Sequence, residues 1–328
     1  MRIFSGIQPS GRKHLGNYIG AIRHYVEGQD RGVAIYCVVD LHAITVPYDP
    51  RELPRYVLDT TAMLLAAGLD PERCILFRQS DVREHSELSW LLGAVTAHGD
   101  LNRMHQFRDK SARQRELVSA GLFFYPVLQA ADVLAYRADE VPVGDDQRQH
   151  IELMRDIAER FNERFGPTLV VPSHRIPEVG ARIMDLQLPE QKMSTTAASE
   201  QGTLYVLDDE RAIAKKVRSA VTDSGADVAR SAEKPGISNL IEVLAVIRGV
   251  APEAVESEFD GHGYGRFKQA VADEVTGFLA PVRERYLELR PDERAVEQVL
   301  EAGAERARAI ASRTLAEVRA AMGVGAGL

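Results

Sequence analysis

The chain has 328 residues, of which 45% are hydrophobic and 27% charged, and its formal net charge is −8 at pH 7. These proportions are typical of a globular protein, and the length allows one large domain plus a smaller one. The acidic balance excludes a protein that holds nucleic acid mainly by long-range attraction, but it does not exclude an RNA partner at a local basic surface. Lys215, Lys216 and Arg218 are a candidate for such a surface, although composition alone favours a solvated helix face there. No apolar run approaches the roughly 18 residues that span a bilayer.

The cysteines and the N-terminus indicate the cellular compartment in which the protein is expected. Cys37 and Cys74 are too few for a four-thiolate zinc or iron–sulfur site, and Cys37 lies in an apolar run where a buried, reduced thiol is expected. The first residues resemble the start of a strand rather than a signal peptide. We therefore expect a cytosolic protein without zinc or an iron–sulfur cluster, and with no metal ligands of its own.

Short β-like runs alternate with helical patterns in the first half of the chain. Ile3–Ser5, Val33–Val39 and Cys74–Phe77 are apolar enough to be buried parallel strands. This alternation predicts an α/β fold with a doubly wound, Rossmann-like parallel sheet, in which ligands bind beyond the carboxyl ends of the strands. From about residue 208 onward, helical patterns predict a mostly α-helical C-terminal domain.

A glycine-rich turn, Gly6–Asn17, follows the first strand and leads into a helix that begins near Gly16. A helix N-terminus offers unpaired N–H groups and a partial positive charge, which suit a phosphate. The glycine spacing is not that of the dinucleotide fingerprint. His14 and Asn17 are three residues apart and can reach the same side, while Gly16 leaves bare backbone for a flat ring. The quartet His14-Leu-Gly-Asn17 therefore favours a nucleotide site.

Asp132 interrupts an apolar run, Tyr125–Tyr136, whose apolar residues cover nearly every side of the predicted helix. A buried carboxylate is costly unless it is hydrogen-bonded or paired. Tyr125, Gln129 and Asp132 are spaced i, i+4, i+7 and share one helical face, which resembles a pocket floor. The residues alone leave open an aspartate that caps a helix or pairs with a core arginine.

Two further segments carry polar groups. Val141–His150 ends a strand-like run and opens a helix, with adjacent carboxylates at Asp145 and Asp146. These could bind a metal, receive ribose hydroxyls or, as the simplest interpretation, cap the helix. Gln191–Ser199 is a polar loop with one lysine, Lys192, and by itself indicates only a loop.

Together these segments resemble the HIGH and KMSKS signatures of class I aminoacyl-tRNA synthetases, here His14-Leu-Gly-Asn17 and Lys192-Met-Ser-Thr-Thr196. More narrowly, the chain resembles the bacterial tryptophanyl-tRNA synthetases over nearly its whole length. The stretches that carry this resemblance are residues 5–11, 39–45, 125–136, 141–150, 155–162 and 234–239.

The resemblance implies a tryptophan–tRNA ligase that uses ATP with Mg²⁺ to convert L-tryptophan to tryptophanyl-adenylate plus pyrophosphate, and then transfers tryptophan to tRNA(Trp). It implies a catalytic domain over residues 1–196, an anticodon-binding domain over residues 197–328, and a homodimer. Because the tryptophan carboxylate itself attacks the α-phosphorus, no protein nucleophile is expected. Catalysis would rest on positioning and on charge stabilisation.

The resemblance also assigns roles to individual residues. The catalytic residues would be His14, Asn17 and Lys192. ATP would be bound by Gln8, Pro9, Ser10, Gly16, Asn17, Gly144, Asp145, Asp146, Ile183, Lys192, Met193, Ser194, Thr195 and Thr196. Tryptophan would be held by Asp132 at the indole N–H, by Tyr125 and Gln147 at the amino group, and by Gln129, Phe4, His42 and Val143 around the ring. Phenylalanine would leave an unpaired Asp132, and sites of that kind reject such analogues by roughly 10⁴–10⁵-fold, whereas tyrosine must be excluded by shape.

Two positions depart from the family pattern. The signature loop usually carries a second lysine where this chain has Thr195, so the pyrophosphate charge would fall on Lys192 with a helper such as Lys110 or Arg182. Gln129 stands where methionine is common, and a polar amide there could alter inhibitor binding or hydrate the pocket.

Three alternatives remain. A tyrosyl-tRNA synthetase shares the fold and a pocket aspartate, but residues 8–11 and 145–150 favour tryptophan. An adenylate-transferring enzyme of the same superfamily would usually lack a helical domain of this length and would not depend on tRNA. A catalytically weak paralogue that binds tryptophan or RNA is suggested only by Thr195, against the retained His14, Asp132, Asp146 and Lys192.

Overall fold

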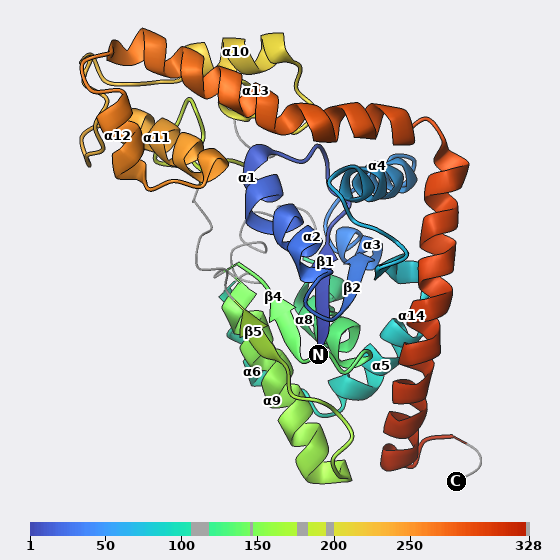
Figure 1. Cartoon of the computed structure of the whole chain (residues 1–328). Coiled ribbons are helices and arrows are strands. Elements are labelled where there is room, and N and C mark those ends of the chain that lie inside the picture. Colours follow the sequence, from blue (N-terminus) through green and yellow to red (C-terminus); the bar gives the residue numbers. More distant parts are fainter. Residues whose placement is uncertain (106–117, 145–146, 176–182, 195–199, 326–328) are drawn as a thin grey trace. The chain divides into compact units, whose positions relative to one another are not determined.

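The computed structural model describes residues 1–105, 118–144, 147–175, 183–194 and 200–325, and the chain divides into two compact units (Figure 1). Unit 1 consists of Met1–Ser10, His24–Glu178 and Asp292–Leu328. Unit 2 consists of Gly11–Arg23 and Val179–Pro291. Among the described residues, no helix is long and apolar enough to cross a membrane.

Unit 1 contains a five-stranded parallel sheet, which confirms the predicted doubly wound α/β fold. Its strands, in spatial order, are β3 (Cys74–Arg78), β2 (Val33–Val38), β1 (Arg2–Ile7), β4 (Glu140–Pro142) and β5 (Ser173–Arg175). The strand order changes direction between β1 and β4, and ligands of open α/β sheets bind beyond such a switch point.

Burial explains which strands the sequence predicts. In β2 every residue after Val33 is buried, so the strand reads as a continuous apolar run. The three residues of β5 are all exposed, and therefore no apolar pattern marks this edge strand. β1 pairs with β2 from Arg2 opposite Val33 to Ile7 opposite Val38, which brings the carboxyl ends of both strands to the same edge.

Helices pack around this sheet. The helical segments of unit 1 are α2 (Arg23–Gly28, its first residue in unit 2), α3 (Asp40–Ala43), α4 (Leu53–Ala66), η2 (Gln79–Asp81), α5 (Glu84–Gly93), α6 (His98–Asn102), α8 (Ala120–Leu134), α9 (Arg148–Phe165) and α14 (Glu293–Met322). α8 packs against α5 and α9, and the buried side chains of all three join one core with the strands. This core fixes the positions of the α8 side chains that face the carboxyl ends of the strands.

The last helix, α14, belongs to unit 1 and packs along β3 and α5 (Figure 1). Gly303 allows this approach, because a Cβ at that position would lie 1.8 Å from the carbonyl oxygen of Leu76. Arg306 Nη1 donates hydrogen bonds to the carbonyl oxygens of Pro71 and Cys74, at 2.7 and 3.0 Å. The compact units therefore differ from a division between residues 196 and 197, because the C-terminal helix completes the core of the sheet-containing unit.

Unit 2 is predominantly helical and confirms the helical character expected after residue 208. Its segments are α1 (Leu15–Asn17), η1 (Tyr18–Ile22, a π-helix), η4 (Glu200–Gly202), α10 (Glu210–Arg218), α11 (Pro235–Arg248), α12 (Pro252–Glu258) and α13 (Gly263–Leu289). α11 begins with Pro235 and Gly236 in its first turn, where proline is tolerated, and a Cβ at Gly236 would lie 1.9 Å from the Val221 carbonyl oxygen. α11 is thereby held close to the segment after α10.

Candidate active site

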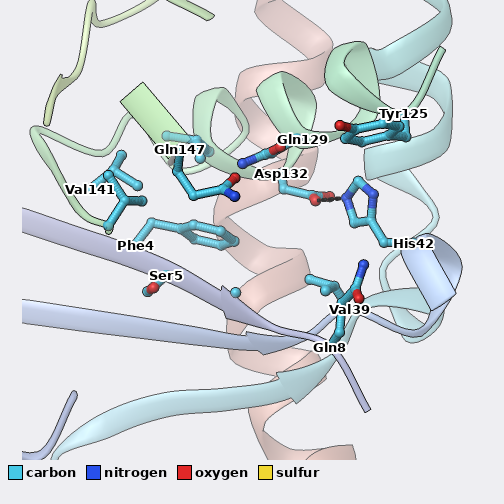
Figure 2. A pocket seen from close by; sticks show the side chains of 13 residues that line it. Phe4, Ser5, Gln8, Val39, His42, Tyr125, Gln129, Asp132, Val141 and Gln147 are labelled. Carbon is cyan, nitrogen blue, oxygen red and sulfur yellow. Dashed lines mark hydrogen bonds and ion pairs between the residues drawn. The ribbon is translucent and has the colours of Figure 1, made fainter. Parts of the chain in front are cut away.

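A cavity of about 410 Å³ in unit 1 opens beyond the carboxyl ends of β1 and β2, against one face of α8 (Figure 2). All seven residues predicted to surround the indole and amino groups line this cavity: Phe4, His42, Tyr125, Gln129, Asp132, Val143 and Gln147. The structure adds Ser5, Gly6, Gln8, Val39, Val133 and Val141 to its wall. The i, i+4, i+7 face of α8 is thus a pocket floor.

Asp132 is 2% exposed and makes close polar contacts through both carboxylate oxygens. His42 Nε2 donates to Oδ2 at 2.8 Å, and Gln79 Nε2 donates to Oδ1 and Oδ2 at 2.8 and 2.9 Å. His85 Nδ1 lies 2.7 Å from Oδ1. The partners of this buried acid are therefore two histidines and a glutamine, in place of the core arginine or helix cap that the sequence left open.

These contacts decide the charge of Asp132. Burial alone would raise the pKa of the carboxyl, but hydrogen bonds and positive charge from His42 and His85 outweigh it and hold the pKa below its ordinary value. Asp132 is therefore ionised at neutral pH and can only accept hydrogen bonds.

Gln79 and His85 were missed in the sequence, although both are fully buried. A signal existed, since Gln79 directly follows the apolar strand β3, at the edge where ligands bind. His85 follows six residues later, and its Nε2 lies 2.6 Å from the hydroxyl of Tyr136. Neither residue lines the cavity itself, so they act on it through Asp132.

The rest of the pocket combines aromatic walls with amides. Tyr125 packs edge-on against His42, and its hydroxyl lies 2.8 Å from His150 Nε2. Burial raises the pKa of Tyr125, so its hydroxyl stays protonated. Figure 2 shows Phe4, Gln129 and Gln147 pointing into the space in front of Asp132. A flat apolar group with a donor on its edge and a polar group beyond it matches this lining.

In unit 2, His14 caps α1 as part of a reciprocal pair. The Asn17 N–H donates to His14 Nδ1 at 3.3 Å, and the His14 N–H donates to Asn17 Oδ1 at 3.2 Å. Burial, with smaller contributions from the charges of Lys192 and Lys13, lowers the pKa of His14 to about 4. The ring is therefore neutral at pH 7, and because Nδ1 accepts a hydrogen bond, Nε2 carries the proton.

Gly16 lies directly against this imidazole. A Cβ at Gly16 would be 3.0 Å from His14 Nδ1 and Cε1, and 3.7 Å from the Cβ of Ile183. The structure thus brings together three predicted nucleotide-site residues, His14, Gly16 and Ile183, and Asn17 joins them through the cap. Any larger side chain at position 16 would displace the imidazole.

The described part of the signature loop forms a short antiparallel pairing beside Ile183. Lys192 pairs with Met184, and the Met193 N–H donates to the Ile183 carbonyl at 3.0 Å. Asn239 holds the same segment, since its side chain accepts from the Met184 N–H at 2.9 Å and donates to the Met184 carbonyl at 3.0 Å. Ser194 is also placed here, with its carbonyl accepting from Thr203 Oγ1 at 3.1 Å.

The predicted ATP residues are divided between the two units. Gln8, Pro9, Ser10 and Gly144 lie in unit 1, and Gly16, Asn17, Ile183, Lys192, Met193 and Ser194 lie in unit 2. Asp145, Asp146, Thr195 and Thr196 lie outside the described residues, as do the proposed helpers Lys110 and Arg182. The assignment of these residues to ATP stays a prediction.

Comparison with known proteins identifies the family of the chain. Residues 1–280 match the family described as tRNA synthetases class I (W and Y). The chain belongs to this family of aminoacyl-tRNA synthetases.

Individual relatives resemble nearly the whole chain. It is 50% identical over 319 residues to the tryptophan–tRNA ligase 2 of Streptomyces avermitilis, which covers 96% of this chain and 95% of that protein. A crystal structure of tryptophanyl-tRNA synthetase from Mycoplasma pneumoniae is 34% identical with a TM-score of 0.88, over 99% of this chain and 98% of the other. The Campylobacter jejuni tryptophanyl-tRNA synthetase complexed with ADP and tryptophan is 33% identical with a TM-score of 0.85, over 99% and 100% of the two chains.

Proposed function

We propose that this enzyme is a tryptophan–tRNA ligase, which activates L-tryptophan with ATP and transfers it to tRNA. The observation that carries the proposal is the ionised Asp132 at the floor of a largely apolar cavity. An indole ring fits apolar walls and has one N–H donor, and an ionised carboxylate is a strong acceptor for it. The relatives named above are tryptophan enzymes, which supports the same substrate.

The contacts of Asp132 change the expected basis of specificity. Oδ2 accepts from His42 without a ligand present, so phenylalanine in the pocket would leave the carboxylate paired. The roughly 10⁴–10⁵-fold rejection argued for a site left unpaired is therefore an upper bound for phenylalanine. Apolar contacts and the shape of the cavity must contribute the rest of the discrimination against phenylalanine, as they must contribute the discrimination against tyrosine.

Activation needs the carboxylate of tryptophan close to the α-phosphorus of ATP. Tyr125 and Gln147 hold the amino group and so orient the attacking carboxylate. On the nucleotide side, neutral His14 with its proton on Nε2 is a donor for a phosphate oxygen. The positive charge of Lys192 stabilises the negative charge that develops on the leaving pyrophosphate. The adenosine would lie near Ile183, beside the glycine at position 16 that leaves room for the His14 imidazole.

Mg²⁺ accompanies ATP in this proposal and neutralises phosphate charge when it is bound. Among the described residues, no group of three or more His, Cys, Asp or Glu side chains is placed to hold a metal. In nucleotide sites Mg²⁺ is usually held by phosphate oxygens and water with only one or two carboxylates from the protein.

The tRNA surface is proposed for the helical region 197–328, with two copies of the chain acting as a dimer in the cytosol. Lys215 and Arg218 are exposed on α10 and remain candidate phosphate contacts. Lys216 is not, because it is buried and its Nζ donates to Asp208 Oδ2 at 2.6 Å and to the Thr203 carbonyl at 2.8 Å.

Amino-acid-dependent ATP–pyrophosphate exchange tests the proposal, with tryptophan, tyrosine and phenylalanine in parallel. We expect strong exchange with tryptophan, little with the other two, and loss of the tryptophan signal in Asp132→Ala. Exchange with tyrosine instead would make the chain a tyrosine enzyme. Exchange with none of the three would contradict the ligase and favour a regulatory paralogue.

A further inference from the structure

Gln79 stands outside the cavity, yet its side chain joins the elements that build it. It is fully buried in η2, directly after β3. Its Oε1 accepts from the Leu41 N–H of α3 at 3.0 Å, and its Nε2 donates to both oxygens of Asp132 on α8. Because the Leu41 N–H requires an acceptor, the amide cannot turn over, and Nε2 must face Asp132.

The contacts divide the carboxylate into two sides. Oδ1 lies 2.8 Å from Gln79 Nε2 and 2.7 Å from His85 Nδ1, and both of these residues are fully buried and outside the cavity wall. Oδ2 accepts from Gln79 Nε2 at 2.9 Å and from His42, which does line the cavity. Gln79 therefore holds both oxygens from behind, and Oδ2, whose other partner His42 lines the cavity, is the oxygen on the side that a ligand can reach.

We propose that Gln79, braced by His85, is a positioning residue that fixes the Asp132 carboxylate so that Oδ2 accepts the N–H donor of the substrate. The inference rests on the proposed function, because it takes tryptophan as the occupant of the cavity. Without the Gln79 donor, the carboxylate can rotate about its Cβ–Cγ bond and loses one of its charge-assisted hydrogen bonds. The expected result is weaker binding of tryptophan, with little effect on the reaction at the phosphates.

The substitution Gln79→Glu isolates this role. It keeps the size of the side chain and an acceptor for the Leu41 N–H, but it places a carboxylate against Asp132. We expect the KM for tryptophan in pyrophosphate exchange at pH 8 to rise by at least about tenfold, since a hydrogen bond to a charged group is replaced by repulsion. The kcat and the KM for ATP should change little.

A pH profile distinguishes the positioning role of Gln79 from a general disruption of the pocket by the substitution. Two carboxylates in contact share a proton at higher pH than either does alone, and the introduced carboxyl group, once protonated, regains a donor toward Asp132. The KM for tryptophan in Gln79→Glu should therefore approach the wild-type value as pH falls from 8 to 6. Gln79→Met, which removes the donor permanently, should show the same loss at every pH.

Other titratable groups face this network, and their contribution to the pH dependence of KM must be separated from that of residue 79. The ratio of variant to wild-type KM at each pH removes their shared contribution. They are His42 and Asp40 on α3, His85 and Glu84 on α5, Asp81 on η2, Tyr125 and Tyr136 on and after α8, and Cys37 on β2.

Gln29→Glu is the matched control. Gln29 is also a buried glutamine of unit 1, but its amide binds only backbone groups, the carbonyls of Val26 and Gly68 and the Asp70 N–H. We expect this variant to melt at a lower temperature and to keep the wild-type KM for tryptophan. A tryptophan KM that rises equally in both variants would assign the Gln79 effect to general destabilisation and overturn the inference.

The remaining outcomes are also decisive. An unchanged tryptophan KM in Gln79→Glu, or a loss without pH rescue, would contradict the positioning role while the wild type still exchanges with tryptophan. Absence of tryptophan-dependent exchange in the wild type would instead contradict the proposed function. If Gln79→Glu does not fold, Gln79→Met decides, with a tryptophan KM about tenfold higher expected and an unchanged one contrary to the inference.

Discussion

At the scale of single residues, the site depends on two buried polar groups whose charge is set by their neighbours. Asp132 stays ionised because His42, Gln79 and His85 replace the water that burial removes. His14 stays neutral because burial and nearby lysines disfavour its charged form. Asp132 thus offers an acceptor to the cavity of unit 1, and His14 offers a donor at the start of α1 in unit 2.

The low pKa of His14 predicts a pH dependence of stability. The folded-state pKa is about 4, below the ordinary 6.5, so between these values the unfolded chain binds a proton that the folded chain does not. Stability must therefore fall as pH drops from 6.5 toward 4, by roughly 1–3 kcal/mol from this group. We expect His14→Asn, which keeps a capping side chain, to flatten the dependence in urea unfolding measured from about pH 7 to about pH 4.5. An equally steep dependence in the variant would contradict the assignment.

At the scale of elements, the cavity of unit 1 lies at strand ends, and the signature loop of unit 2 is held by a short backbone pairing. The segment that pairs with Lys192 is held at Met184 by Asn239, so an element 55 residues further along the chain positions the loop lysine. Asn239 ends one of the stretches that resemble the family, and its contacts give it a structural role in this chain.

The signature loop makes its own prediction. Because this loop carries Lys192 and no second lysine, Lys192→Ala should lower kcat for pyrophosphate exchange by roughly 10²-fold or more. Lys192→Arg keeps the charge and should retain more of the activity than the alanine variant does. Near-normal exchange in Lys192→Ala would show that other groups carry the pyrophosphate charge.

At the scale of the whole molecule, the C-terminal helix is part of the sheet-containing unit. Gly303→Ala should destabilise the protein by roughly 1–3 kcal/mol or more, because its Cβ would overlap the backbone of β3 at Leu76. Gly277→Ala in α13 is the matched control, since a Cβ there meets nothing within 4 Å. This control should be stabilised by about 0.5–1 kcal/mol through the lost flexibility of glycine. Equal unfolding midpoints in urea would contradict the tight packing of α14.

These cases show what the sequence could and could not predict. The parallel sheet was predictable because its central strands are apolar on both faces, and the pocket floor was predictable because Tyr125, Gln129 and Asp132 share a helical face. The partners of Asp132 were not, since Gln79 and His42 lie 53 and 90 residues away and only folding brings them together. The packing of α14 against unit 1 was not predictable either, because an apolar helix face in the sequence does not indicate which unit the helix packs against.

The central claim is that Asp132 accepts the indole N–H of tryptophan. The most direct test compares kcat/KM for tryptophan with that for L-3-benzothienylalanine, which has a similar shape but sulfur in place of the N–H, in wild type and in Asp132→Asn. We predict that the wild type prefers tryptophan by at least about tenfold and that the variant prefers it much less, since the neutral amide of asparagine is a weaker acceptor than the carboxylate. The same preference in both proteins would contradict the claim.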